Sequence, residues 1–274
     1  MSNDRYINAN RELWNEWTKV HVHSDFYNVD EFKKGKITLK DIELAELGDV
    51  KNKSLLHLQC HFGLDTLSWA RLGAEVTGVD FSEEAIEYAK RLSQELDIPA
   101  RFICSNIYDT IELITDKFDI VFTSYGVLCW LPDLVEWAEI ISHFLRCGGI
   151  FYIVEFHPVN NIFDNEKDTE GLVAKYSYFH STDPVKWESD GTYADKTAVI
   201  SNPSFEWTHS MSDIINSLIS AGLTIEFVHE FPYCYYDHYP FMEKDDKGWW
   251  RLKNIEAEVP LTFSLRARKV QPDH

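Results

Sequence analysis

Short runs of strand-forming residues alternate with runs of helical periodicity from residue 54 to near the end of the chain. Strands are expected at residues 54–58, 75–79, 101–104, 118–123, 150–155, 224–231 and 261–268. Helices are expected at residues 64–72, 82–96, 134–145 and 211–221. Such an alternation is typical of a mostly parallel sheet covered by helices on both faces. The pattern therefore predicts an α/β fold.

The first part of the chain, residues 1–50, precedes this alternation. It holds an expected helix with Leu13, Trp14 and Trp17 on one side, followed by a short helix around residues 39–47. The segment is too small to enclose a core of its own. We therefore expect it to act as an N-terminal helical lid on a larger domain.

That larger domain is expected to span residues 51–274, because 274 residues suffice for one large α/β domain and are few for two. Its periodicity is lost between about residues 156 and 207, which we interpret as an aromatic insertion. Ligands of α/β folds bind at the open edge where loops gather. The insertion, together with Trp14, Phe26 and Tyr27, is expected to cover that edge on the substrate side, and a homodimer through the insertion is an open alternative.

The charge balance narrows the class of partner. With 26 Lys and Arg against 45 Asp and Glu, the formal net charge is -19, which repels nucleic acid and anionic membranes. A small-molecule partner is expected instead. No apolar run is long enough to span a bilayer, and the N-terminus lacks an apolar signal core, so the expected location is cytoplasmic.

The possible metal ligands are scattered. The five cysteines are widely spaced and form no Cys-x-x-Cys pair, which argues against a zinc site and a disulfide framework. His21 and His23 flank Val22, and we interpret them as surface histidines because no third ligand follows at a recognisable spacing. No metal is expected.

One junction carries most of the chemical information. After the strand expected at 54–58, residues 59–63 form a tight turn into a helix, and such turns direct backbone N–H groups at a ligand. Asp80 ends the next strand, where a carboxylate can accept hydrogen bonds from both hydroxyls of a ribose. Turn and carboxylate together predict a nucleoside pocket, although Asp80 is also placed to cap the following helix.

These residues resemble the class I S-adenosylmethionine-dependent methyltransferases. The resemblance rests on LLHLQCHFGLDTLSWARLGAEVTGVDFSEEAI at 55–86, FDIVFTSYGVLCWLPD at 118–133 and PLTFSLRARK at 260–269, and it looks like a subgroup of small bacterial enzymes. It implies a Rossmann-like fold whose mostly parallel seven-stranded sheet has an antiparallel final strand. It also implies S-adenosyl-L-methionine as cofactor and methyl transfer to a small-molecule acceptor.

The resemblance further implies a set of cofactor-binding residues. They are Gln59, Cys60, His61, Phe62, Gly63, Asp80, Phe81, Ser105, Asn106, Ile107 and Thr123. Residues 59–63 would lie along the methionine part and Asp80 would hold the ribose. Asn106 would contact the adenine amino edge, and Thr123 would border the reacting methyl group.

The turn departs from the glycine-rich pattern of that family, because Gln59 and His61 stand where glycine is usual. Larger side chains disfavour positive φ angles, so we expect the loop backbone to avoid them and to hold the methionine tail differently. Two alternatives therefore stay open. One is a protein that keeps the fold and binds without catalysis, and the other is an NAD-dependent oxidoreductase.

Methyl transfer needs an acceptor placed in line with the leaving sulfur, and some acceptors also need a base. Tyr125, which follows the expected strand 118–123, is one candidate. Glu155 and His157 are others, because they share a face at the end of the strand expected at 150–155. A structural role for Glu155, as a buried ion-pair partner, is equally compatible with the pattern.

Overall fold

The computed structural model describes residues 3–188 and 191–271, so residues 1–2, 189–190 and 272–274 of the expected segments lie outside the described residues. Its centre is a seven-stranded sheet in the order β3-β2-β1-β4-β5-β11-β8. The strands are β1 (Ser54–Leu58), β2 (Glu75–Asp80), β3 (Arg101–Cys104), β4 (Phe118–Ser124), β5 (Leu145–Phe156), β8 (Leu223–Phe231) and β11 (Thr262–Lys269). β11 runs antiparallel to both of its neighbours, while the pairs from β3 to β5 are parallel. The predicted sheet, with its antiparallel final strand, is confirmed.

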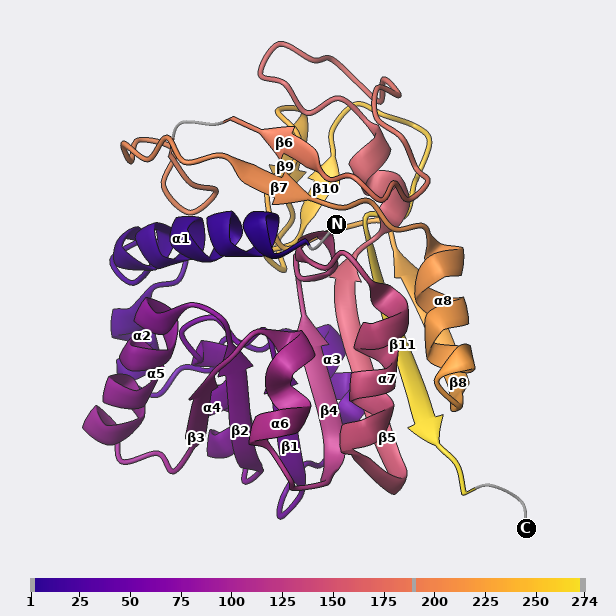
Figure 1. Ribbon diagram of the computed structural model, residues 1–274. Helices are drawn as coiled ribbons and strands as arrows, with labels where there is room; N and C mark the ends of the chain where they lie inside the picture. The colour runs from indigo at the N-terminus through magenta and orange to yellow at the C-terminus, as the bar shows by residue number, and fades with distance from the viewer. Residues whose placement is uncertain (1–2, 189–190, 272–274) are drawn as a thin grey trace.

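Helices cover both faces of the sheet, as the alternating pattern predicted (Figure 1). They are α3 (Asp41–Leu47), α4 (Leu64–Arg71) and α5 (Glu83–Glu95) on one face, and α6 (Thr110–Leu113), α7 (Leu134–Phe144) and α8 (Met211–Ser220) on the other. Polar side chains define where these helices begin. Ser82 accepts a hydrogen bond from the Ala85 N–H at 3.1 Å, and Asp133 accepts two from the first turn of α7.

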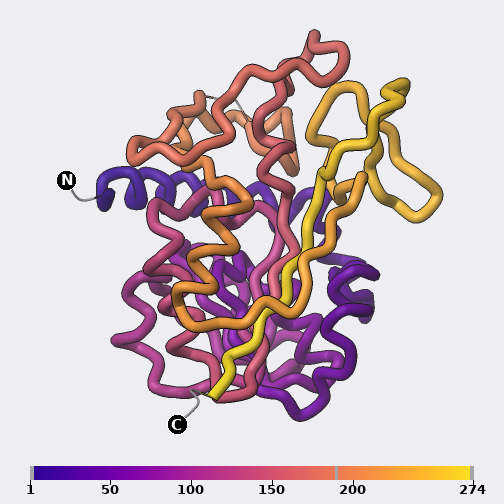
Figure 2. Tube along the Cα trace, turned by 90° about the vertical axis from the view of Figure 1, so that its right-hand side faces the viewer, coloured from indigo at the N-terminus to yellow at the C-terminus, as the bar shows by residue number. Residues whose placement is uncertain are grey.

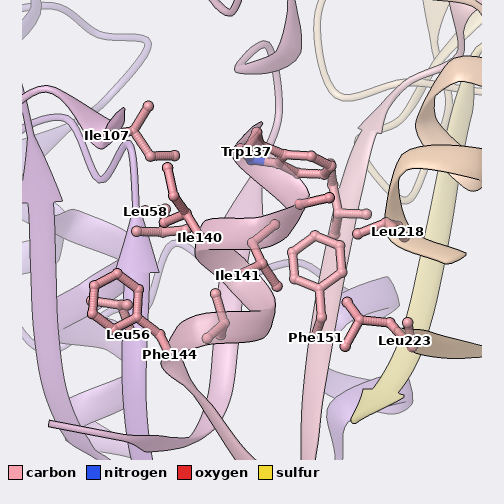
Figure 3. Packing of buried hydrophobic residues seen from close by; sticks show 14 of the residues in the cluster. Leu56, Leu58, Ile107, Trp137, Ile140, Ile141, Phe144, Phe151, Leu218 and Leu223 are labelled. Atoms are coloured by element: carbon pink, nitrogen blue, oxygen red, sulfur yellow. The ribbon is translucent and has the colours of Figure 1, made fainter. Parts of the chain in front are cut away.

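Alternate residues of each strand enter different cores, because successive side chains point to opposite faces. Leu56, Phe151 and their neighbours pack against α7 and α8, where Trp137 and Ile141 are fully buried (Figure 3). Tyr152, next to Phe151, instead enters the core beneath α3 and α4. The strands are thus buried on both faces, which explains their continuous apolar runs.

The N-terminal segment divides into two parts. Helix α1 (Asp4–His21) lies across the carboxyl-terminal edge of the parallel strands, packed against α5 (Figure 1). After α2 (Val29–Lys33), by contrast, Leu39, Ile42 and Val50 are buried in the core that contains Phe122. The first part of residues 1–50 therefore lies over the edge, whereas the apolar side chains of α3 pack on the sheet.

Two further segments lie above the same edge. One contains a 3-10 helix (Pro158–Ile162) and the antiparallel pair β6 (Val185–Trp187) and β7 (Ser204–Glu206); the other contains the antiparallel pair β9 (Met242–Lys244) and β10 (Trp250–Leu252). Both views show them on the side opposite the C-terminus (Figure 1, Figure 2). The second segment was not predicted. No helix in the described part of the chain is both long and apolar enough to cross a bilayer.

Candidate functional site

A cavity of about 630 Å³ opens at the carboxyl-terminal edge of the parallel strands, beneath α1 and the two covering segments. This is the edge at which open α/β sheets bind ligands. The predicted cofactor residues that line it are Gln59, Cys60, His61, Phe62, Gly63, Asp80, Phe81, Ser105, Asn106 and Ile107. The fold therefore brings together residues from the ends of β1, β2 and β3.

Asp80 is one of five aspartates in the cavity wall and the one at the end of β2; the others are Asp25, Asp41, Asp65 and Asp237. Its Oδ2 accepts a hydrogen bond from the His61 N–H at 2.8 Å, and its Oδ1 accepts one from the Ser82 N–H at 2.9 Å. Burial raises the pKa of this carboxyl to about 6, so it is ionised at neutral pH. Each carboxylate oxygen keeps a second lone pair with which it can accept a further hydrogen bond.

The loop after β1 adopts the conformation that we expected it to avoid. The φ angles of Gln59 and His61 are 57° and 50°, in the left-handed region, and Gly63 follows at 82°. This expectation was wrong. The backbone keeps the positive φ angles, and the surroundings of the loop accommodate the larger side chains of Gln59 and His61. A left-handed non-glycine residue costs about 1–2 kcal/mol, and contacts of the two side chains offset that cost.

Those contacts tie the loop to its surroundings. The Gln59 Nε2 group donates to the Val127 carbonyl oxygen at 2.9 Å. His61 Nε2 lies 3.0 Å from His21 Nδ1 at the end of α1, within hydrogen-bond distance. His21 is fully buried, so its interpretation as a surface histidine is corrected. Burial lowers the pKa of His21 to about 3 and that of His61 well below its usual range, which keeps both imidazoles neutral.

The end of β3 forms the far wall. The Ser105 N–H donates to the Asp80 carbonyl oxygen at 2.9 Å, which holds this turn beside β2. The Asn106 side chain accepts a hydrogen bond from the Tyr108 N–H at 3.4 Å and begins the 3-10 helix Ile107–Asp109. Ile107 is buried and lines the cavity next to Asn106.

Thr123 is not in the cavity wall. Its hydroxyl donates to the Leu58 carbonyl oxygen at 3.1 Å, and the residue is fully buried within the sheet. The residues that follow it at the end of β4, Ser124 and Tyr125, do line the cavity. The predicted contact of Thr123 with the reacting group is therefore corrected, because the threonine side chain points into the sheet.

Tyr125 is held by a buried acid from the N-terminal segment. Its hydroxyl donates to Glu43 Oε2 at 3.0 Å, and the backbone of Tyr125 has a positive φ of 31°. Burial raises the pKa of Glu43 to about 8. A phenol oxygen that donates its proton to Glu43 can still accept a hydrogen bond from a ligand.

Glu155 and His157 lie outside the cavity wall. The Glu155 carboxylate accepts hydrogen bonds from the N–H groups of Val127 at 2.7 Å and Leu128 at 3.2 Å, and from that of Gly126. His157 Nε2 lies 2.8 Å from the Glu230 carboxylate on β8. The placement of these two candidates at the site is thus corrected: Glu155 organises the turn after β4, and His157 is turned toward β8.

The remaining wall was predicted only in part, through the expected insertion and Trp14, Phe26 and Tyr27, which all line the cavity. Aromatic rings from α1, from the 3-10 helix Leu128–Trp130, from the expected insertion and from residues 232–260 enclose the cavity; they include Trp14, Trp130, Tyr193, Tyr235, Trp249 and Trp250. Lysines at its border, Lys40, Lys244 and Lys247, were not predicted either. Residues 232–260 carry no helical or strand periodicity, so only the fold places them here. His180, in the expected insertion, lines a separate cavity.

Comparison with known proteins agrees with this geometry. Residues 56–153 match a family model described as a methyltransferase domain. The ubiquinone biosynthesis O-methyltransferase of Proteus mirabilis is 26% identical over 149 residues, which is 48% of this chain and 60% of that protein. The uncharacterised methyltransferase YbaJ of Bacillus subtilis is 24% identical over 80% of this chain and 85% of its own length.

Solved structures show the same fold. The S-adenosylmethionine-dependent methyltransferase from Mesorhizobium loti aligns with 82% of this chain and 94% of its own at 19% identity, with a TM-score of 0.58. One from Clostridium acetobutylicum aligns with 84% and 89% at 15% identity, also with a TM-score of 0.58. The protein thus has the fold of the S-adenosylmethionine-dependent methyltransferases. Its own methyltransferase domain comprises residues 56–153, on a chain that adds α1 and the covering segments.

The residues present fit S-adenosylmethionine. Asp80 offers free lone pairs for ribose hydroxyls, while Phe81 and Ile107 offer apolar surface for a planar base. The cavity volume of about 630 Å³ is within the usual range for sites that enclose a ligand of this size.

Proposed function

We propose that this protein transfers the methyl group of S-adenosylmethionine to a small-molecule acceptor. The observation that carries the proposal is the position of Asp80: an ionised carboxylate at the end of β2, facing a cavity whose floor is the loop after β1. The methyltransferase domain at residues 56–153 supports the same function.

In this proposal, each wall of the cavity has a distinct task. Asp80 accepts hydrogen bonds from the ribose hydroxyls, Asn106 and Ile107 hold the adenine, and the loop at residues 59–63 lies along the methionine part. The cofactor, when bound, supplies an electrophilic methyl group on sulfur. The covering segments exclude water from the reacting atoms, and this exclusion favours displacement by the acceptor.

The aromatic wall supports a small, planar or cationic acceptor. Trp14 and Trp130 pack edge to face with ring centroids 5.3 Å apart. The ring centroids of Tyr125 and Tyr235 are 4.4 Å apart. Rings of this kind bind planar groups by stacking and cations by cation–π attraction. Tyr125, held by Glu43, can accept a hydrogen bond from an acceptor hydroxyl.

The proposal keeps the partners expected from the sequence. A net charge of -19 disfavours nucleic acid, and a cytoplasmic site of action agrees with five free cysteines. A homodimer is retained only as an alternative to be tested by the mass in solution.

The function is tested by titrating the purified protein with S-adenosylmethionine, S-adenosylhomocysteine and NAD in a calorimeter. Micromolar binding of the two sulfur compounds, weakened at least about a hundredfold in Asp80→Ala, is the expected result, because the loss removes charge-assisted hydrogen bonds to the ribose. The matched control is Asp109→Ala, an exposed acid outside the cavity wall, which should bind like the wild type.

Other results of this titration would contradict the proposed function. Binding of neither sulfur compound would overturn the proposal, and binding of NAD alone would favour an oxidoreductase. If S-adenosylmethionine binds, a screen of hydroxyl, amine and carbon acceptors for S-adenosylhomocysteine release tests catalysis. Tight binding with no turnover on any acceptor class would favour a protein that binds without catalysis.

A further inference from the structure

Besides His57 Nε2, three polar side-chain atoms of residues in the cavity wall have no hydrogen-bond partner in the described parts of the chain. They are Trp14 Nε1, His61 Nδ1 and Gln59 Oε1, and all three atoms are buried. Buried polar atoms without partners are rare and costly in folded proteins. Three of them around one cavity indicate that a ligand supplies the missing partners.

The three atoms belong to one part of the wall. The rings of Trp14 and His61 pack edge to face with centroids 4.9 Å apart, which brings α1 against the loop after β1. Gln59 belongs to the same loop, two residues before His61. This part of the wall is directly linked to Asp80, because the His61 N–H donates to the Asp80 carboxylate.

The chemistry of these atoms matches the two ends of an amino acid. The indole Nε1–H can only donate, so it suits a carboxylate, whereas the Gln59 carbonyl oxygen accepts and suits an ammonium group. His61 can do either, depending on its tautomer. Both imidazoles of the His21–His61 pair are neutral, so each carries a single proton.

The contact between His21 and His61 determines which tautomer of His61 suits a carboxylate. When His21 Nδ1–H donates to His61 Nε2 across their 3.0 Å contact, the single proton of His61 is on Nδ1, which becomes a second donor beside the indole. The opposite arrangement leaves a bare lone pair on His61 Nδ1, which would repel a carboxylate. Binding of the anion therefore favours the first arrangement.

We propose that the amino-acid end of the cofactor is held by side chains: Trp14 and His61 donate to its carboxylate, Gln59 accepts from its ammonium group, and His21 orients His61. This inference rests on the proposed function and adds to it a recognition group from outside the domain at residues 56–153, since Trp14 belongs to α1. The large side chains at Gln59 and His61 thus take over contacts that a glycine-rich loop makes with its backbone.

The test compares two ligands that differ only at this end. S-adenosylhomocysteine carries the amino-acid group, whereas 5′-methylthioadenosine keeps the adenosine and the sulfur without it. By calorimetry, Trp14→Phe and His61→Gly should each weaken S-adenosylhomocysteine binding by about tenfold and leave 5′-methylthioadenosine binding unchanged. Trp14→Phe removes the indole N–H and keeps a ring, and His61→Gly introduces the residue that best tolerates the positive φ.

Trp17→Phe is the matched control. Trp17 Nε1 is also buried without a partner among the described residues, but Trp17 does not line the cavity, so its substitution should leave both affinities unchanged. Thermal unfolding of each variant shows whether it has folded.

The outcomes separate the two proposals. If the wild type binds neither ligand, the proposed function fails and this inference fails with it. If the wild type binds both but Trp14→Phe and His61→Gly weaken both equally, or weaken neither, the amino-acid site is overturned while the function stands. Weaker S-adenosylhomocysteine binding in Trp17→Phe would also overturn it, because packing of α1 would then explain the effect.

Discussion

The backbone N–H of His61 donates a hydrogen bond to Asp80 Oδ2 at 2.8 Å. This bond joins the loop after β1 to the carboxylate at the end of β2, so the two elements that face the ligand form one unit. It depends on the left-handed conformation of the loop, with φ of 50° at His61. A substitution that keeps this backbone conformation should therefore leave the Asp80 carboxylate in place, whereas one that disrupts it should affect both elements.

The ionisation of Asp80 should control cofactor binding. Because burial raises the pKa of its carboxyl to about 6, protonation below that pH removes a hydrogen-bond acceptor for the ribose. We expect the affinity for S-adenosylhomocysteine to be constant from pH 7 to 8 and to fall by up to about tenfold per unit below pH 6. Calorimetry from pH 5 to 8 measures this, and a flat profile would contradict it.

Glu43 should make the protein less stable as the pH rises. Its pKa is raised from 4.5 to about 8 in the folded state, so the folded state favours the protonated carboxyl. That contribution to stability is complete below pH 4.5 and is lost as the pH rises to about 8. We expect the free energy of unfolding of the wild type to fall across this window, relative to Glu43→Gln, by a few kcal/mol, on the order set by about 1.4 kcal/mol per pKa unit.

Urea unfolding at pH 5 and pH 8 measures that difference. The exposed Glu112→Gln serves as the matched control and should change with pH like the wild type. If the stability of the wild type and of Glu43→Gln depended on pH in the same way, burial would not raise the pKa of Glu43 and the prediction would be contradicted.

Glu155 should prove structural. Its carboxylate accepts hydrogen bonds from consecutive backbone N–H groups at residues 126–128 and from that of Phe156. Glu155→Ala leaves these buried donors without a partner, so we expect a loss of about 3 kcal/mol or more in the free energy of unfolding. Glu155→Gln should lose less, because one acceptor oxygen is kept. Stability equal to that of the wild type in Glu155→Ala would disprove this role.

Gly78 should tolerate no side chain. A Cβ atom there would lie 2.8 Å from the ring of Phe102 and 2.9 Å from the sulfur of Cys60. We expect Gly78→Ala to lower the free energy of unfolding by about 1–3 kcal/mol through overpacking. In a double-mutant cycle with Phe102→Leu, measured by urea unfolding, part of that loss should be recovered. Additive effects of the two substitutions would rule out the proposed contact.

The sheet could be predicted from the sequence because its strands are buried on both faces. Ser54–Leu58 is an apolar run apart from Ser54 and His57, and His57 is accommodated by a 2.8 Å hydrogen bond to the Thr66 hydroxyl. The antiparallel direction of β11 came instead from the resemblance to a family. Strand patterning alone does not determine the direction in which a buried strand runs.

The wall of the site was only partly predictable. Asp80 and the loop at residues 59–63 belong to regular strand-to-helix connections, whose position follows from the alternation. Tyr235 and Lys244 belong to segments without periodicity, and tertiary packing alone brings them to the cavity. The strand alternation grouped Glu155 with His157 on one expected face, but it could not show that nearby backbone amides occupy the Glu155 carboxylate.

The placement of β11 also constrains the order in which the chain can assemble. Among the strands of the sheet, β8 pairs only with β11, and β11 follows β8 in the chain. During synthesis, β8 therefore leaves the ribosome before its partner exists, and β5 keeps an unpaired edge over the same interval. Open strand edges invite pairing with other chains. Until β11 inserts between β5 and β8, this nascent protein should be most dependent on protection from aggregation.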